Sequence, residues 1–363
     1  QGEAGGPAWV ENTTAEWHTT LISFAESPVE PGLLWAGSDD GLLHVSRDGG
    51  GEWRDVSANV PSMPEFSPVS HIEPSRRAAD VAYVAFDRHM FDDFRAHIYV
   101  TSDAGSTFQR ISDGLPEGAW VWIVREDPRN QELLWAGTEL GLYASHDRGG
   151  TWRRLHLKNL PTVSIHDVLV HPRENDLILG THGRAIWVFD DATPLQEFDP
   201  AVDGQDNLLF NMRRAFRYPS RFTRYGLGDR RHKAPNPPSG ALITYYLSED
   251  LEDGENGEES ELSANVEAPT ASSDETTQER LKVEILDSGG EVIRTLDGET
   301  LGRAKGLHRV AWDLAMDGAR QRTDENPEVS EFSGPPRGPW VLPGTYTDRL
   351  NEDDEVLEAP VEV

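Results

Sequence analysis

The segment from Asp87 to Arg95 brings acids, a histidine, guanidinium groups and aromatic rings together within one short stretch of sequence. Long polar loops on rigid scaffolds are common places for binding and catalysis, so this stretch is a candidate site. In the alternative interpretation, its acids and arginines pair locally and its phenylalanines cover a sheet edge. Asp87 is a candidate catalytic carboxylate. The candidate ligand-binding residues of the stretch are Arg88, His89, Asp92 and Asp93.

Two further carboxylates, Asp39 and Glu139, occupy loops that correspond to the Asp87 loop in a repeat described below. Glycoside hydrolysis requires two carboxyl groups that face each other, about 5–5.5 Å apart for retention and roughly 6.5–9.5 Å apart for inversion. If the repeat brings these loops to one face, two of the three carboxylates could form such a pair, with Arg88 or Arg184 orienting the substrate. The other candidate ligand-binding residues in the corresponding loops are Asp40, His182 and Arg184.

Several other chemistries lack their residues. The sequence contains no cysteine, which excludes disulfides, cysteine-ligated zinc and thiol catalysis. It also lacks a Gly-x-Ser-x-Gly nucleophile elbow, a P-loop and the Asp-rich order of an EF-hand calcium loop. The histidines show no short metal-binding spacing. We therefore expect neither a metal site nor a cofactor.

The charge balance excludes further classes of partner. The 363-residue chain has 64 Asp plus Glu against 33 Lys plus Arg, a formal net charge of −31. A nucleic-acid-binding protein neutralises phosphates with clustered Lys and Arg, so this balance argues strongly against nucleic acid and disfavours anionic membranes. No stretch approaches the roughly 20 apolar residues of a membrane-spanning helix. The excess of carboxylates suits a halophilic surface or reflects the composition of the genome.

An internal repeat supplies the elements that position these residues. The pentapeptide Leu33–Gly37 recurs letter for letter as Leu133–Gly137, and each copy is followed by an apolar run and a turn. The turns fit Ser/Thr-x-Asp-x-Gly-x-Thr-Trp, with Glu52 and Phe108 as departures. The Asp carboxylate of this motif can accept hydrogen bonds from the turn's own N–H groups. The residues with this structural role are Ser46, Asp48, Gly50 and Trp53; Thr101, Asp103, Gly105 and Phe108; and Ser145, Asp147, Gly149 and Trp152.

The spacing of the repeat predicts β-propeller blades. Apolar segments end in Pro28, Pro74, Pro128 and Pro172, at steps of 46, 54 and 44 residues. Periods near 45 residues made of four short strands are typical of propeller blades. In the second unit the strands are expected at 69–73, 81–86, 97–101 and 107–111, and in the fourth at 177–180 and 185–189.

The three turns resemble the Asp boxes, or BNR repeats, of sialidase-like and sortilin-like propellers. The chain looks like the C-terminal half of a family of large exported proteins with sortilin-type propellers, often labelled glycosyl hydrolase. In sialidase-like propellers the ligand occupies the face opposite the Asp boxes, which here carries the loops between the second and third strand of each blade. The segments that carry the closer resemblance are Val69–Pro74, Asp87–His89, the hairpin at Glu139, Thr181–Arg184, Trp187, Asp190 and Asp191.

Four blades are fewer than the rings that this family builds. We therefore expect further blades N-terminal to Gln1 or on a partner, with a closed four-bladed ring as the alternative. The resemblance also implies a secreted protein, or one of the periplasm or cell surface.

A second domain follows the propeller segment 1–198. The connector 199–239 interleaves arginines with aromatic residues. Alternating apolar positions in 240–363, with Gly-rich turns, then predict a small antiparallel β-sandwich, which resembles the Ig-like domain of flagellar hook-capping proteins. The acidic stretch 249–279 has almost no large apolar residue and is expected to be a disordered loop.

Two functions remain open from the sequence. The first is a noncatalytic propeller that binds protein or carbohydrate, because no complete catalytic set can be assembled. The second is a glycoside hydrolase of the sialidase-like propeller class that uses the paired carboxylates, although no convincing tyrosine nucleophile of a true sialidase is present. The fold class expected in both cases is all-β, with Asp-box blades followed by an Ig-like sandwich.

Overall fold

The computed structural model describes residues 19–157, 159–198, 206–217, 238–251, 281–318, 338–352 and 355–363. The chain forms two compact units, Gln1–Ala192 and Thr193–Val363, and each is described by itself. The predicted acidic loop 249–279 lies outside the described residues from position 252 onward, as do residues 218–237 of the connector. Among the described residues, no helix is long and apolar enough to cross a membrane.

The first unit consists of three four-stranded antiparallel sheets and one three-stranded sheet, in chain order. Each strand pairs with the next one along the chain, so every sheet is a simple up-and-down blade. The first two sheets are β1 (Leu21–Glu26), β2 (Leu34–Ser38), β3 (Leu43–Ser46) and β4 (Arg54–Asp55), then β5 (His71–Pro74), β6 (Ala82–Phe86), β7 (His97–Thr101) and β8 (Gln109–Arg110). The other two are β9 (Val121–Glu126), β10 (Leu134–Thr138), β11 (Gly141–Ser145) and β12 (Arg153–Arg154), then β13 (Ile165–Val170), β14 (Leu177–Thr181) and β15 (Ile186–Phe189). Short 3-10 helices are η1 (Ser57–Asn59) and η2 (His89–Phe91).

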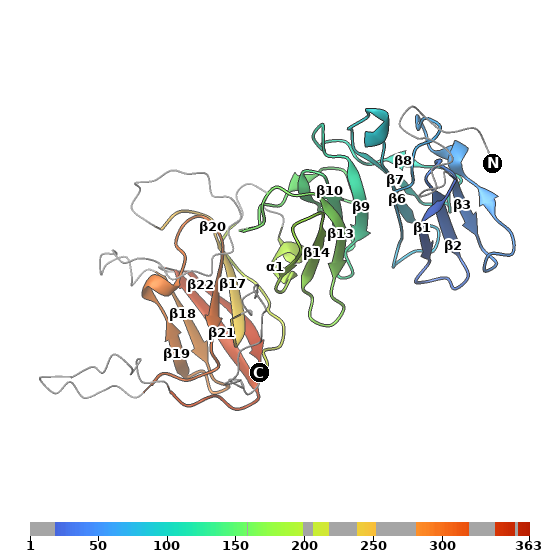
Figure 1. The fold of residues 1–363 in the computed structure, drawn as a ribbon. Helices are drawn as coiled ribbons and strands as arrows, with labels where there is room; N and C mark the ends of the chain where they lie inside the picture. Colours follow the sequence, from blue (N-terminus) through green and yellow to red (C-terminus); the bar gives the residue numbers. More distant parts are fainter. Residues whose placement is uncertain are drawn as a thin grey trace, which may run out of the picture. The chain divides into compact units, whose positions relative to one another are not determined.

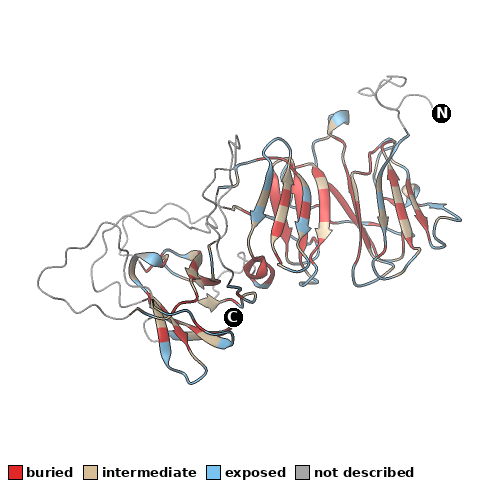
Figure 2. Ribbon diagram, turned by 60° about the horizontal axis from the view of Figure 1, so that its bottom comes forward, coloured by how far each residue is buried: buried red, intermediate tan, exposed pale blue. Residues whose placement is uncertain are grey.

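The four sheets pack face to face in a row, each on the next along the chain (Figures 1 and 2). Apolar side chains from adjoining sheets form the cores between them, for example Trp35 and Leu43 against Ile72 and Val84. This is the arrangement of consecutive propeller blades, and it confirms the all-β propeller class predicted from the sequence.

Glycines of the repeated pentapeptide lie where two sheets approach most closely. A Cβ atom built on Gly37 would lie 2.5 Å from Val69 Cγ1 of the second sheet. One built on Gly137 would lie 2.6 Å from the carbonyl oxygen of Ile165 in the fourth sheet. No side chain larger than hydrogen fits at either position without moving a neighbouring strand.

The three predicted turns share one hydrogen-bond pattern. In the third sheet, the backbone N–H of Thr151 donates to Asp147 Oδ1 over 2.7 Å, and that of Gly149 donates to Ser145 Oγ over 2.7 Å. Burial disfavours the charged form of Asp147, but hydrogen bonds from Thr151 and Ser145 outweigh it and lower the pKa of the carboxyl. The hydroxyl-to-carboxylate distances are 2.8 Å for Ser46–Asp48, 2.9 Å for Thr101–Asp103 and 2.7 Å for Ser145–Asp147.

The innermost strands of the second, third and fourth sheets are joined by an ion-pair chain. Arg125 on β9 contacts Glu73 on β5 at 2.7 Å and Asp167 on β13 at 3.4 Å, and its Nε donates to the carbonyl oxygen of Val168. Burial raises the pKa of Glu73, and Arg125 opposes this shift. One guanidinium group therefore links strands of three sheets.

The two end sheets each leave an apolar face exposed in the described part of the first unit. Phe24 on β1 is 57% exposed, although its counterpart Val124 on β9 is completely buried. In the fourth sheet, Leu169, Ile186 and Val188 are likewise exposed. Apolar faces of this kind normally pack against another layer.

The second unit is an antiparallel β-sandwich. One sheet has the order β16-β17-β20 and the other β19-β18-β21-β22, and both contribute to one apolar core that includes Ile243 and Val283. Its elements are α1 (Thr193–Glu197), β16 (Leu208–Leu209), β17 (Ala241–Leu247), β18 (Leu281–Leu286), β19 (Val292–Leu296), η3 (Gly298–Thr300), β20 (Gly306–Trp312), β21 (Thr345–Glu352) and β22 (Glu355–Glu362).

Part of the expected connector belongs to this sandwich. β16 pairs with β17, and the N–H of Ala215 donates to the carbonyl oxygen of Glu362 at the end of β22. Phe198, which ends the predicted propeller segment, packs against Phe210 and Tyr246 of the second unit. Burial of these few apolar side chains attaches the segment to the sandwich. From the sequence, the same segment is expected to be a connector because of its arginines.

Candidate functional site

Six aromatic rings form a continuous row at the end of the sheets that carries the loops between the second and third strands. Three of them lie in these loops, and the other three lie at the starts of the first strands β9 and β13. In spatial order the six rings are Phe94, Trp120, His89, Trp122, His166 and His182, and we call this set the ring row. The four successive centroid distances from Trp120 to His182 are 5.2, 5.5, 4.1 and 4.8 Å, and Phe94 lies 5.6 Å from Trp120. The row therefore crosses the second, third and fourth sheets.

β-Bulges place two adjacent rings of the row, Trp122 and His166. In β9, Ile123 and Val121 pair with consecutive residues of β10, so Trp122 between them is the extra residue. In β13, Ile165 and Asp167 pair with consecutive residues of β14, so His166 is extra in the same way. Bulges re-aim side chains and are frequent beside active sites. Here they let neighbouring inner strands present stacked rings, with an interplanar angle of 28° between Trp122 and His166.

Two of the predicted carboxylates hold rings of the row. Asp87 accepts a hydrogen bond from His89 Nδ1 over 2.7 Å, and Glu139 Oε2 accepts one from Trp122 Nε1 over 3.2 Å. Burial and neighbouring His182 lower the pKa of His166, while Glu139 and Asp87 oppose that shift. Asp87 and Glu139 therefore bond neighbouring rings, since the centroids of His89 and Trp122 lie 5.5 Å apart, and the structure brings both carboxylates to one rim.

Asp39 and Asp40 belong to a tight turn of the first sheet. The buried carboxylate of Asp39 accepts a 2.8 Å hydrogen bond from the N–H of Thr20, and the N–H of Asp39 donates back to the carbonyl oxygen of Thr20. Asp40 accepts a hydrogen bond from Ser38 Oγ. Neither side chain contacts a ring of the row.

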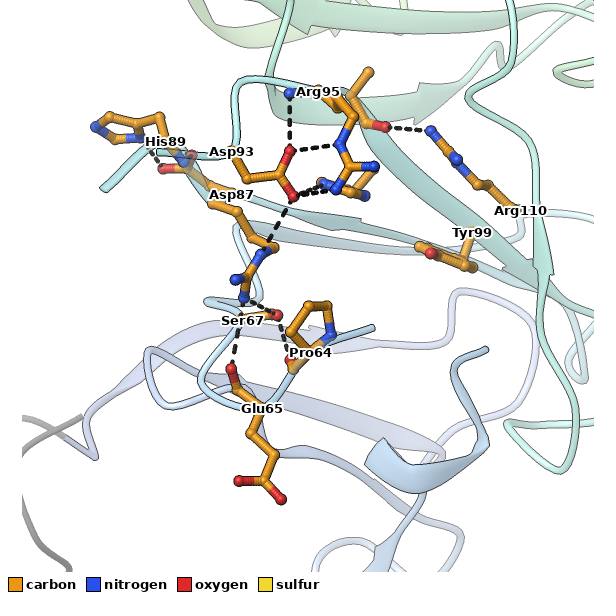
Figure 3. A network of polar contacts seen from close by, with 12 residues as sticks. Pro64, Glu65, Ser67, Asp87, His89, Asp93, Arg95, Tyr99 and Arg110 are labelled. Atoms are coloured by element: carbon orange, nitrogen blue, oxygen red, sulfur yellow. Dashed lines mark hydrogen bonds and ion pairs between the residues drawn. The ribbon is translucent and has the colours of Figure 1, made fainter. Parts of the chain in front are cut away.

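Asp93 and Arg95 belong to a local polar network in the long loop (Figure 3). Arg88 joins this network, since its Nε lies 3.5 Å from Asp93 Oδ2. Asp93 accepts hydrogen bonds from Arg95 at 2.7 and 2.8 Å and lies 3.0 Å from His97 Nε2. The hydrogen bonds with Arg95 hold the pKa of Asp93 far below its usual range, despite partial burial. Arg88 is buried and donates to Ser67 Oγ over 2.6 Å. These contacts match the local-pairing interpretation of Arg88 and Asp93.

The remaining predicted ligand-binding residues lie at the surface. Asp92 follows η2 in the left-handed region, with a φ of 57°, and is exposed. His182 and Arg184 are exposed in the loop between β14 and β15, where the carbonyl oxygen of Arg184 accepts a hydrogen bond from Trp187 Nε1. His182 ends the ring row, so it is the member of this group that the structure joins to the other candidates.

Four members of the row, Phe94, Trp120, Trp122 and His166, were not among the predicted site residues. Two tryptophans at the start of an inner strand, in the segment Trp120–Trp122, were an available signal because the matching position of the first sheet holds Ile22. The bulges that aim the rings leave no mark in the sequence pattern. Among the described residues there is no cluster of three or more His, Cys, Asp or Glu suited to a metal ion.

A cavity of about 290 Å³ lies elsewhere in the first unit, between the inner strands of the first and second sheets. Its lining includes His71, Glu73, Arg76 and Arg125 but no member of the ring row. Burial lowers the pKa of His71 to about 3, so this imidazole is neutral at pH 7. The ring row is thus a surface feature rather than the wall of this cavity.

No family model and no curated protein matches the chain. Among solved structures, YCF48 from Cyanidioschyzon merolae matches with 17% identity and a TM-score of 0.33, over 53% of this chain and 67% of that one. The GH74 enzyme of Niastella koreensis matches with 15% identity and a TM-score of 0.38, over 64% of this chain and 36% of that one.

A GH74 xyloglucanase from Xanthomonas campestris matches with 13% identity and a TM-score of 0.40, over 95% of this chain and 54% of that one. The chain therefore spans about a third to a half of the length of the two GH74 structures. These matches are to β-propeller proteins and bear on the fold alone.

Proposed function

We propose that the first unit is a noncatalytic interaction module that binds a protein segment or a carbohydrate on the ring row. The observation that carries the proposal is the continuity of the row across three sheets, with Asp87 and Glu139 holding its rings. Exposed Phe94 and His182 end the row, and the four rings between them are half-buried. Such a surface offers apolar contact together with hydrogen-bond donors and acceptors, which is the composition of many protein and sugar sites.

The repeated turns on the opposite face support this assignment by contrast. Their carboxylates are occupied by hydrogen bonds within each turn, as for Asp147, so they are suited to hold the scaffold. The row is formed where the sheets differ from one another. Function on repeat scaffolds is generally carried by such variable loops.

Binding to glycan and peptide arrays, followed by titration of the best ligand, tests the proposal. Trp122→Ala should weaken binding about tenfold or more, because a central aromatic contact is worth roughly 1.5 kcal/mol or more. Trp53→Ala is the matched control, since Trp53 is also partly exposed but belongs to a turn on the other face. Equal losses in both variants, or no ligand for the unaltered chain, would refute the proposal.

The second candidate function is glycoside hydrolysis by Asp87 and Glu139. The observation in its favour is that the two carboxylates bond neighbouring rings of the row, His89 and Trp122, whose centroids lie 5.5 Å apart. A panel of glycosides with Asp87→Asn and Glu139→Gln tests it, because loss of either group of a catalytic pair should remove nearly all turnover. Absence of turnover by the unaltered chain, together with ligand binding at the row, would leave the first function alone.

We further propose that the three turns are Asp boxes of a sortilin-like or BNR-type propeller, that the sandwich is Ig-like, and that the protein is exported and possesses a halophilic surface. The exposed apolar faces of the first and fourth sheets support additional blades that continue the series of sheets.

The turn tryptophans also support additional blades: Trp53 is 40% exposed, whereas the matching Trp152 is 7% exposed and packs on the preceding sheet. Hydrogen exchange of β1 in the native protein checks the additional blades, because exchange would be fast if this sheet had no preceding neighbour.

A further inference from the structure

An exposed patch of the second unit combines aromatic rings with arginines, and it is independent of the ring row. Arg217 lies over the ring of Trp340 at 4.8 Å, and Arg214 lies over the ring of Phe216 at 5.7 Å. Leu342 adjoins Trp340 along the chain. We call Arg214, Phe216, Arg217, Trp340 and Leu342 the arginine–aromatic patch.

Backbone hydrogen bonds attach the two segments of the patch to the sandwich, and the side chains of the patch are exposed. The N–H of Ala215 donates to the carbonyl oxygen of Glu362 over 2.8 Å, which fixes the segment that carries Arg214, Phe216 and Arg217. Trp340 forms a β-bridge with Ala315. The conformations of both segments are therefore set by the fold.

The apolar part of the patch is unusually exposed. Phe216 is 60% exposed, Trp340 54% and Leu342 78%. Isolated surface leucines need no explanation, but a tryptophan, a phenylalanine and a leucine at one place indicate an interaction surface. Tryptophan and arginine are also the residues that most often dominate protein–protein binding energy.

The charge of the patch opposes that of the chain. Residues 207–217 contain three arginines and no acid, in a protein with a formal net charge of −31. In the part of the chain that the structure describes, neither Arg214 nor Arg217 has a carboxylate partner. A guanidinium group stacked on a ring keeps its N–H edges available for a carboxylate.

We propose that this patch binds an acidic, partly apolar polypeptide segment of another protein. Its glutamate or aspartate side chains pair with Arg214 and Arg217, and its apolar side chains contact Phe216, Trp340 and Leu342. Charge complementarity selects an acidic partner, and the apolar contacts of Leu342 and Trp340 favour a polypeptide over a purely polar acidic polysaccharide.

The test uses the full 363-residue chain and a 12-residue probe peptide of leucine, serine and glutamate, with glutamine and lysine versions as controls. The glutamate peptide should bind at least about tenfold more tightly than the glutamine version, because charge-assisted pairing is lost in the latter. Polygalacturonate serves as the polysaccharide arm, and tighter binding of polygalacturonate than of the glutamate peptide would overturn the proposal.

Variants locate the binding. Arg217→Gln and Trp340→Ala should each weaken peptide binding about five- to tenfold. Leu342→Ser should weaken it too, and this highly exposed position does not endanger folding. Lys305→Gln is the control, since it removes one positive charge from an exposed position elsewhere in the same unit. An equal loss with Lys305→Gln, or equal affinity for the glutamine peptide, would refute the proposal.

Discussion

The second strands of the first and third sheets, β2 and β10, begin within the same pentapeptide but bury it differently. Leu33–Gly37 and Leu133–Gly137 are identical, and the tryptophan is completely buried in both. Leu134 is also completely buried, whereas Leu34 is only half-buried. The third sheet packs between two neighbours, and the first sheet has a neighbour on one side only in the described part of the unit.

This difference distinguishes the structure that the repeated sequence itself determines from the burial that the neighbouring sheets provide. The sequence of the pentapeptide suffices for a strand, because alternate residues face opposite sides. Whether both sides become core depends on the sheets that adjoin it. Substitutions at matched positions of the two sheets should therefore differ in cost, and their ratio measures how much of the stability comes from the neighbouring sheet.

The largest difference is expected for the tryptophans of the turns. Trp152→Ala should lower the free energy of unfolding by about 3–5 kcal/mol, because a buried ring and its hydrogen bond to the carbonyl oxygen of Ile111 are lost. Trp53→Ala should cost less than about 1 kcal/mol, since its ring is already partly exposed. Urea unfolding followed by circular dichroism measures both. Equal costs would show that a neighbour covers Trp53.

Asp348 is a buried side chain of the second unit that, unlike the buried tryptophans of the first unit, is polar. It lies on the central strand β21, completely buried and without a hydrogen-bond partner in the part of the chain that the structure describes. Burial raises the pKa of its carboxyl to about 7. Between pH 4 and pH 7 the folded state therefore holds a proton that the unfolded state has released.

Stability of the second unit should accordingly fall as the pH rises from 4 to 7, by up to about 4 kcal/mol. Asp348→Val should abolish this dependence, whereas Asp297→Asn, at an exposed position, should leave it unchanged. Hydrogen exchange of β18 and β22 at several pH values provides the measurement. A flat pH profile in the unaltered chain would contradict the buried carboxyl.

The smallest difference is expected within the pentapeptide itself. Leu134→Ala should cost about 2–4 kcal/mol, the usual range for a completely buried leucine. Leu34→Ala should cost about 1 kcal/mol, because its side chain is only half-buried. Unfolding in urea gives both values. If Leu34→Ala were as costly as Leu134→Ala, the first sheet would have to be enclosed on both sides.

Much of the fold could be predicted from the sequence because propeller strands are local and repetitive. The expected strands of the second sheet at 81–86 and 97–101 correspond to β6 and β7, and the expected strands of the fourth sheet at 177–180 and 185–189 correspond to β14 and β15. β22 was missed because the acid-rich stretch 351–355 obscured its alternation, although Glu352 and Glu355 pair with each other across β21 and β22. α1 was missed because it is a single short turn without a helical period.

The site could be predicted only in part, because its geometry depends on bulges and on packing between sheets. The long loop, Asp87, Glu139, His89 and His182 were selected on residue type and loop position. Trp122 and His166 were not selected, because each is the extra residue of a β-bulge, and the sequence pattern of a strand does not reveal where a bulge lies. Strand formation depends on local sequence preferences and is therefore predictable. The pairing of the rings depends on contacts between strands that are distant in sequence, which the local pattern does not contain.

The glycines at positions 37 and 137 have a geometric consequence for the whole array. They allow adjoining sheets to approach until backbone and side-chain atoms meet, so they help to set the wedge angle between blades. The wedge angle determines how many blades complete a full circle. A single alanine at such a position would force the two sheets apart at that point, and the angle between those two blades would change.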